Sequence, residues 1–165
     1  MLSAALTRAL ITPAFVAADF VPTQWGTSEQ KAKFANALLT FIARDFPRSK
    51  FHENFYRRLS NTFGHIADYN RDGFYERFFL TADEKCAFLD QCVTWPCYGD
   101  PTFTYSAVER AIAKRLRKSE IVACLSSQVA VERRGRELAL LAQLKARYEP
   151  AAEAPASAGI RDLFG

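Results

Sequence analysis

Three segments of the chain pair a helix-start signal with apolar residues at helical spacing. Each begins with Thr or Ser and has Gln or Glu three residues later, the capping-box pattern that satisfies free backbone N–H groups at a helix start. The pairs are Thr27 with Gln30, Thr81 with Glu84, and Ser106 with Glu109. Apolar stripes at helical spacing follow all three, and the sequence has no long alternating strand pattern. We therefore expect an all-α fold, an irregular bundle of about six helices.

Aromatic residues are concentrated in the first half of the chain. Eleven of the 22 Phe, Tyr and Trp residues lie between Phe41 and Phe79. Because large rings bury much area, this stretch is predicted to form the centre of the core. The alternative is an aromatic docking surface, which is uncommon on a monomeric domain.

The composition predicts one domain followed by a tail. A length of 165 residues suits a single core, and we place one helical domain at 1–148. Residues 149–165 are rich in Ala and Pro and are expected to be a flexible, disordered tail. Within the last predicted helix, the apolar residues before Gly135 and those after it lie on opposite faces of the helix. This change of phase predicts a break or kink at Gly135, or a helix buried on different partners along its length.

Positive charge is concentrated near the C-terminal end of the predicted domain. Residues 106–148 contain ten Lys/Arg and four Asp/Glu, whereas the whole chain has a net charge of +4. Such a basic region suits nucleic acid or an acidic protein partner, and the alternative is a solvated helix face. The candidate binding residues are Arg110, Lys114, Arg117, Lys118, Arg133, Arg134 and Arg136.

The stretch DYNRDG, residues 68–73, resembles the first half of a calcium-binding loop. Asp68, Asn70 and Asp72 occupy the first three ligand positions, and Gly73 occupies the glycine position. Position 12 is Phe79, which has no side-chain oxygen to serve as the bidentate ligand. We therefore expect a polar turn, with Asp72-Gly73 supplying the reversal, and keep these three residues only as a weak metal candidate.

Catalytic and cofactor motifs are absent from the sequence. The four cysteines form no C-x-x-C pair, and no phosphate-binding loop or dinucleotide fingerprint occurs. We expect no cofactor. A set of His65, Asp68 and Cys97 is the remaining enzymatic hypothesis, because His, Asp and Cys can act together in nucleophilic catalysis.

Two segments resemble known proteins. NTFGHIADYNRDGFYERFF and PCYGDPTFTYSAVERAI look like parts of small uncharacterised proteins carried on bacterial plasmids and other mobile elements, over about residues 50–115. The resemblance implies a bacterial accessory protein of a kind that often binds host or defence proteins. It assigns no catalytic or binding residue.

The C-terminal tail ends in large apolar residues: Ile160, Leu163 and Phe164. Asp162-Leu163-Phe164 is similar to the end of peptides by which bacterial replication proteins bind the sliding clamp, although Ile160 replaces the usual glutamine. A Leu-Phe pair on a flexible segment can fill an apolar groove. The tail is thus a candidate peptide-docking segment.

The sequence favours a non-enzymatic, cytoplasmic binding protein. The leading interpretation is an accessory factor of a mobile element that binds a protein partner, as an inhibitor of a host or defence complex would. The alternatives are a nucleic-acid-binding protein that uses the basic helices, and an enzyme centred on His65, Asp68 and Cys97. No apolar run approaches the ~18 residues of a membrane span, so we expect no membrane association.

Overall fold

Residues 2–63, 69–94 and 105–149 are described in the computed structural model of the chain. These residues contain seven α-helices and two 3-10 helices, and no β-strand. The expected all-α class is confirmed. The helices are α1 (Ala4–Ile11), η1 (Ala17–Asp19), α2 (Ser28–Ala43), η2 (Arg48–Lys50), α3 (Glu53–Thr62), α4 (Arg71–Phe78), α5 (Ala82–Thr94), α6 (Ser106–Ser119) and α7 (Ile121–Tyr148).

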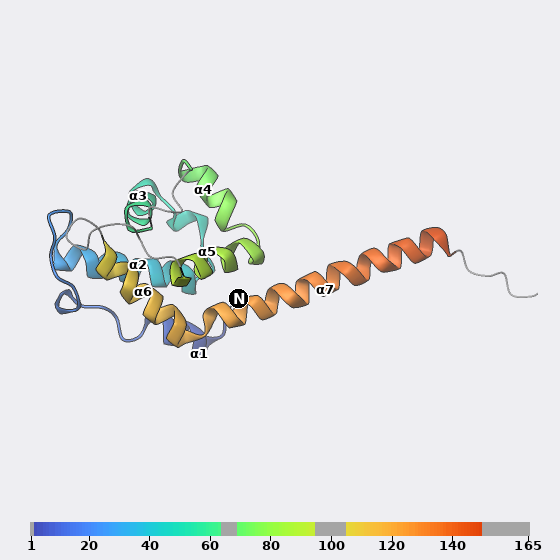
Figure 1. Cartoon of the computed structure of the whole chain (residues 1–165), viewed down its shortest axis with the longest axis horizontal. Helices are drawn as coiled ribbons and strands as arrows, with labels where there is room; N and C mark the ends of the chain where they lie inside the picture. Colours follow the sequence, from blue (N-terminus) through green and yellow to red (C-terminus); the bar gives the residue numbers. More distant parts are fainter. Residues whose placement is uncertain (1, 64–68, 95–104, 150–165) are drawn as a thin grey trace, which may run out of the picture. The chain divides into compact units, whose positions relative to one another are not determined.

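The chain divides into two compact units. The first comprises Met1–Val129 and the second Ala130–Gly165. The predicted domain of residues 1–148 therefore contains residues of both units. Helix α7 crosses the boundary, since it runs from Ile121 to Tyr148 without interruption (Figure 1).

The predicted break at Gly135 is wrong, because α7 is helical on both sides of it. No heavy atom lies within 4 Å of a Cβ built on Gly135, so no neighbouring side chain disturbs the helix there. An exposed glycine costs a helix only about 1 kcal/mol relative to alanine, and the surrounding Glu, Arg and Leu are good helix formers. The change of phase in the apolar stripe leaves apolar side chains exposed and does not end the helix.

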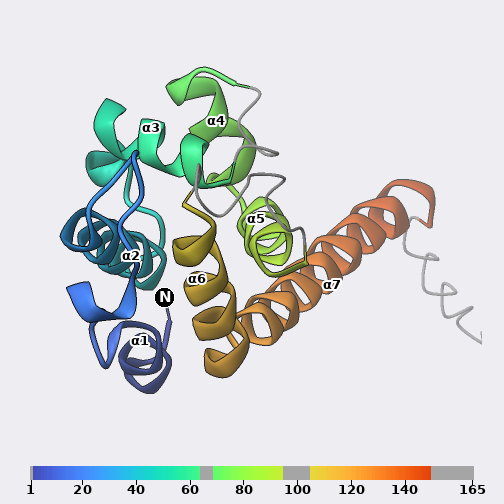
Figure 2. The same ribbon diagram turned by 60° about the vertical axis from the view of Figure 1, so that its left-hand side comes forward.

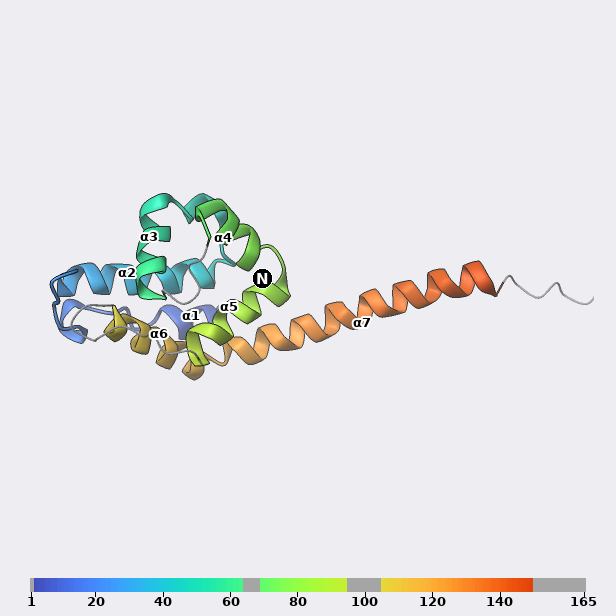
Figure 3. The same ribbon diagram turned by 45° about the horizontal axis from the view of Figure 1, so that its top comes forward.

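Helix α6 is the central element of the first unit. It contacts α1, α2, α3 and α5, and Figure 2 shows it between α2 and α5. Helices α3 and α4 lie together on the same side of α2 and α5 (Figures 1 and 3). Residues far apart in the sequence are thereby brought together around α6.

Packed aromatic rings form the centre of the core, as predicted. Nine of the eleven aromatic residues from Phe41 to Phe79 are buried in the core, and the Phe79 ring is only 2% exposed. Phe79 stacks on Phe46 at 5.0 Å between centroids and meets Phe88 edge-on, also at 5.0 Å. Tyr69, at 44% exposure, is an exception to the pattern.

Two of the three predicted capping boxes form. Thr27 and Gln30 exchange hydrogen bonds of 3.1 and 3.2 Å between side chain and backbone, and Thr81 and Glu84 do the same at 3.0 and 3.3 Å. The box at Ser106 is wrong, because Tyr105 occupies the N-cap position and makes no side-chain capping bond. The buried Tyr105 ring packs edge-on against Phe34, which places Ser106 one residue inside the helix.

Candidate binding surfaces

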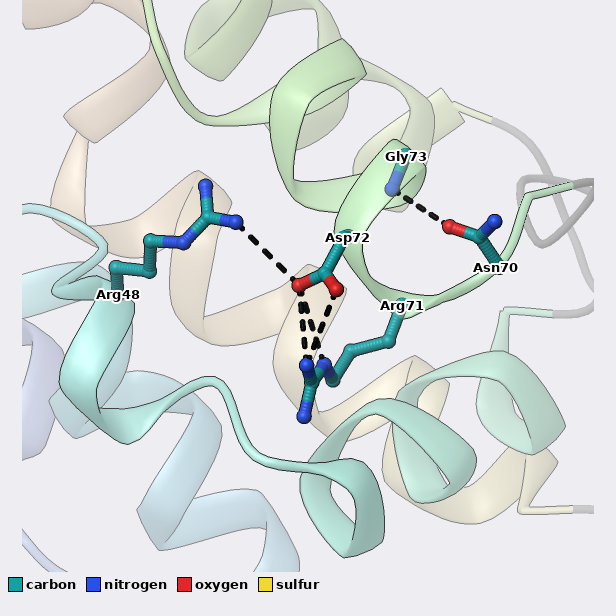
Figure 4. Close-up of polar contacts among 5 residues, drawn as sticks. All are labelled: Arg48, Asn70, Arg71, Asp72 and Gly73. Atoms are coloured by element: carbon teal, nitrogen blue, oxygen red, sulfur yellow. Dashed lines mark hydrogen bonds and ion pairs between the residues drawn. The ribbon is translucent and has the colours of Figure 1, made fainter.

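The polar turn after residue 68 is the start of helix α4. Asn70 is the N-cap, and its Oδ1 accepts a hydrogen bond of 2.8 Å from the backbone N–H of Gly73 (Figure 4). Asp72 and Gly73 lie in the first helical turn, so the predicted reversal at Asp72-Gly73 is wrong. The reason is that the Asn70 side chain provides the cap that begins the helix.

The Asp72 carboxylate is engaged by two arginines. Its Oδ1 and Oδ2 lie 3.1 Å from Arg71 Nη2, and Oδ1 lies 3.3 Å from Arg48 Nη2 (Figure 4). The hydrogen bond from Arg71 lowers the pKa of Asp72, with Arg48 adding an attractive charge. Within the described residues no group of three His, Cys, Asp or Glu side chains could hold a metal ion. Asp68, the first candidate ligand, lies outside the described residues.

The hypothetical catalytic residues His65, Asp68 and Cys97 all lie outside the described residues. The other histidine, His52, has a structural role, since its Nδ1 accepts a 3.3 Å hydrogen bond from the Phe55 N–H at the start of α3. Complete burial raises the pKa of the Cys92 thiol well above its usual value. Cys92 therefore has little thiolate character.

Some basic residues of α6 donate hydrogen bonds to backbone carbonyls of other segments and so brace the fold, whereas others are exposed. Arg115, which was not among the predicted residues, donates hydrogen bonds of 2.8 Å to the carbonyls of Leu10 and Pro13, and burial lowers its pKa. Arg117 donates to the Val93 carbonyl. Lys114 and Lys118 are exposed and one helical turn apart. A nucleic-acid or acidic-partner site on α6 stays a prediction, with Arg110, Lys114, Arg117 and Lys118 as its residues.

The second unit contains the other predicted basic residues on an exposed helix. Arg133, Arg134 and Arg136 are exposed in α7. Four leucines follow them and are between 44% and 56% exposed; these are Leu138, Leu140, Leu141 and Leu144. We call them the leucine cluster. Sequence reasoning identified the arginines but not the exposure of the leucines.

The tail residues Ile160, Leu163 and Phe164 lie outside the described residues, and their docking role stays a prediction.

None of the described helices has both the length and the apolar character needed to cross a bilayer.

A groove of about 960 Å³ opens in the first unit beside α3. It was not predicted from the sequence. We call it the α3 groove; its walls come from the turn before α2, from α3 and from the residue preceding α6. The lining residues are Trp25, Asn54, Tyr56, Arg57, Arg58, Ser60, Asn61 and Tyr105.

Tyr105 connects the walls of the α3 groove. Its hydroxyl accepts a hydrogen bond from the Arg58 guanidinium and lies 3.3 Å from the Trp25 carbonyl oxygen, to which it can donate. Gly26 leaves the space for this approach, because a Cβ there would lie 2.2 Å from the Tyr105 hydroxyl oxygen. The turn that carries Trp25 is thereby fixed against α3 and α6.

Lys31 adds a buried positive charge behind Tyr105. Its side chain is almost fully buried, its Nζ donates a 2.8 Å hydrogen bond to the Val21 carbonyl, and it lies 5.6 Å from the centre of the Tyr105 ring. In the described part of the chain no carboxylate lies within ion-pair distance of Lys31. Burial accordingly lowers the pKa of the Lys31 ammonium.

Comparison of the chain with protein-family models, with curated proteins and with solved structures finds no match.

Proposed function

We propose that the chain is a non-enzymatic binding protein whose residues 130–148 dock onto an acidic, apolar surface of a protein partner. The leucine cluster is the observation that carries this proposal. Four leucines about half exposed within seven residues form an unusual surface for a helix in water. Burying their exposed halves would contribute roughly 3–6 kcal/mol.

The charge pattern around the leucine cluster selects an acidic partner. Residues 130–148 contain five Lys/Arg and two Glu, a net charge of +3. Arg133, Arg134 and Arg136 precede the leucines, and Lys145 and Arg147 follow them. A surface with carboxylates at both ends of an apolar groove would complement this arrangement.

The same pattern disfavours a second copy of the chain as the occupant. In a parallel pair of helices, each arginine group would face the same group of the other copy. In an antiparallel pair centred on the leucine cluster, Glu137 would lie near Lys145 of the other copy, but two segments of net charge +3 would still be brought together. The parallel pairing opposes like charges directly, and both pairings bring two positively charged segments together, which costs binding free energy.

The resemblance of residues 50–115 to plasmid-borne and mobile-element proteins favours a bacterial partner, such as a component of a host or defence complex that the chain would inhibit. The cytoplasm is the compartment in which such a partner would be met. The tail residues Ile160, Leu163 and Phe164 are proposed as a separate docking peptide, because their apolar side chains follow a spacer rich in Ala and Pro.

Affinity capture from a bacterial lysate with matched variants tests the proposal. The full chain is compared with Leu138→Asp/Leu141→Asp, with Arg133→Glu/Arg134→Glu, and with a control, Lys33→Glu, on the exposed face of α2. We expect a specific acidic protein that both 130–148 variants lose and the control retains. Capture that is insensitive to both 130–148 variants would contradict the proposal. A chain truncated after residue 149 measures the contribution of the tail separately.

A further inference from the structure

We propose that the α3 groove binds single-stranded nucleic acid, with Trp25 as a stacking platform and Arg57 and Arg58 as phosphate contacts. This site is separate from residues 130–148 and does not depend on the partner proposed for them. Proteins that bind single strands combine a positively charged groove with aromatic side chains on which bases stack. The α3 groove contains both kinds of group.

A polar stripe of α3 forms one wall of the α3 groove. Asn54, Arg57, Arg58 and Asn61 follow the spacing i, i+3, i+4, i+7, so they share one face of the helix. The two arginines lie between the two asparagines. Guanidinium groups suit phosphate oxygens, and amide groups offer both a donor and an acceptor to the edges of bases.

Trp25 provides an exposed aromatic face that is held in place. Its side chain is 63% exposed, and it lies in the tight turn closed by the paired backbones of Thr23 and Gly26. The Tyr105 hydroxyl anchors the same turn at the Trp25 carbonyl. The backbone of Trp25 is therefore fixed before binding, and stacking of a base on the indole costs less conformational entropy.

The electrostatics of the α3 groove favour an anion. Its lining includes two guanidinium groups and, among the described lining residues, no carboxylate. The nearest acidic partner of Arg57 is Glu53 at 4.0 Å, and both side chains are largely exposed, so this ion pair is weak. Lys31 adds a positive charge behind Tyr105.

Nucleic acid explains this combination better than an acidic peptide does. The carboxylates of an acidic peptide would interact with the two arginines, but they would not stack on the exposed indole. A single strand uses all three groups: the phosphates contact Arg57 and Arg58, a base stacks on Trp25, and base edges meet Asn54 and Asn61. Duplex nucleic acid keeps its bases stacked on one another, so it offers no free base face to Trp25.

Fluorescence anisotropy with the full-length chain tests the site. The labelled probes are oligo-dT and oligo-U of 15 nucleotides each, a duplex of the same length, and poly-glutamate. We expect both single strands to bind more tightly than the duplex and the poly-glutamate. Trp25→Ala should weaken binding about 10- to 100-fold, because stacking contributes that much per base. Unchanged circular dichroism would show that this exposed substitution leaves the fold intact.

A matched charge control locates the site. Arg57→Ala should reduce the slope of log K against log salt by about 0.7, the value for one lost phosphate contact to a single strand. Lys33→Ala removes one exposed cation from α2 and should have the smaller effect. Losses that follow Lys33 and not Trp25 or Arg57 would overturn the proposal, as would tighter binding of poly-glutamate or no binding of either strand.

Discussion

Replacing Phe79 by alanine tests the aromatic core at a ring that contacts six others. The Phe79 ring is 2% exposed, and its centroid lies between 5.0 and 5.7 Å from those of Phe41, Phe46, Phe51, Phe74, Tyr75 and Phe88. Removal of a buried Phe side chain typically costs about 3–5 kcal/mol. Packed ring pairs add about 0.5–1.5 kcal/mol each beyond their buried area, so we expect a loss near the upper end, about 4–5 kcal/mol.

Urea unfolding followed by circular dichroism measures this loss. The neighbouring Leu80→Ala is the control, since Leu80 is 58% exposed and its truncation should change the free energy of unfolding by less than about 0.5 kcal/mol. The slope of the transition should stay the same, because both variants expose similar surface on unfolding. A loss below about 1 kcal/mol for Phe79→Ala, or equal losses for the two variants, would refute the account of the core.

Three further changes test local features. Gly26→Ala places a Cβ against Tyr105 and should lower the free energy of unfolding by about 1–3 kcal/mol; a smaller loss in the Tyr105→Phe background, measured by urea unfolding, would identify the hydroxyl as part of the clash. Asn70→Ala removes the cap of α4 and should cost about 1 kcal/mol in the same assay, and an unchanged midpoint would contradict the capping role. Because burial lowers the pKa of Lys31, the unfolded chain holds the proton more tightly, and stability rises with pH from the folded pKa to the unfolded one. As pH increases from 7 to 10, the natural chain should therefore gain stability relative to the Lys31→Met variant. A stability difference that does not change with pH would contradict this assignment.

Local sequence signals were sufficient to predict the fold class. The capping boxes at Thr27 and Thr81 depend only on residues three positions apart, so the sequence contains the whole interaction. The aromatic stretch from Phe41 to Phe79 had to be buried in a chain with one core, whatever its detailed packing. The Ser106 box failed because burial of the Tyr105 ring, a tertiary contact, decided where α6 begins.

Long-range contacts explain what the sequence did not reveal. The α3 groove depends on Tyr105 meeting Arg58 and Trp25, which are 47 and 80 residues away in the sequence. One local signal was available, the polar stripe Asn54, Arg57, Arg58 and Asn61 on one face of α3. Likewise, no periodicity in the sequence distinguishes bracing Arg115 from exposed Lys114, because the distinction depends on the carbonyls of Leu10 and Pro13.

Site-specific photo-crosslinking in bacterial cells tests the proposed function most directly. A benzoyl-phenylalanine in place of Leu141 samples the leucine cluster, and the same group in place of Lys33 samples an exposed face of α2. We predict a crosslinked adduct from position 141 that contains a different, acidic protein, and no such adduct from position 33. An adduct between two copies of the chain, the same products from both positions, or no adduct from position 141 would contradict the claim that residues 130–148 bind a protein partner.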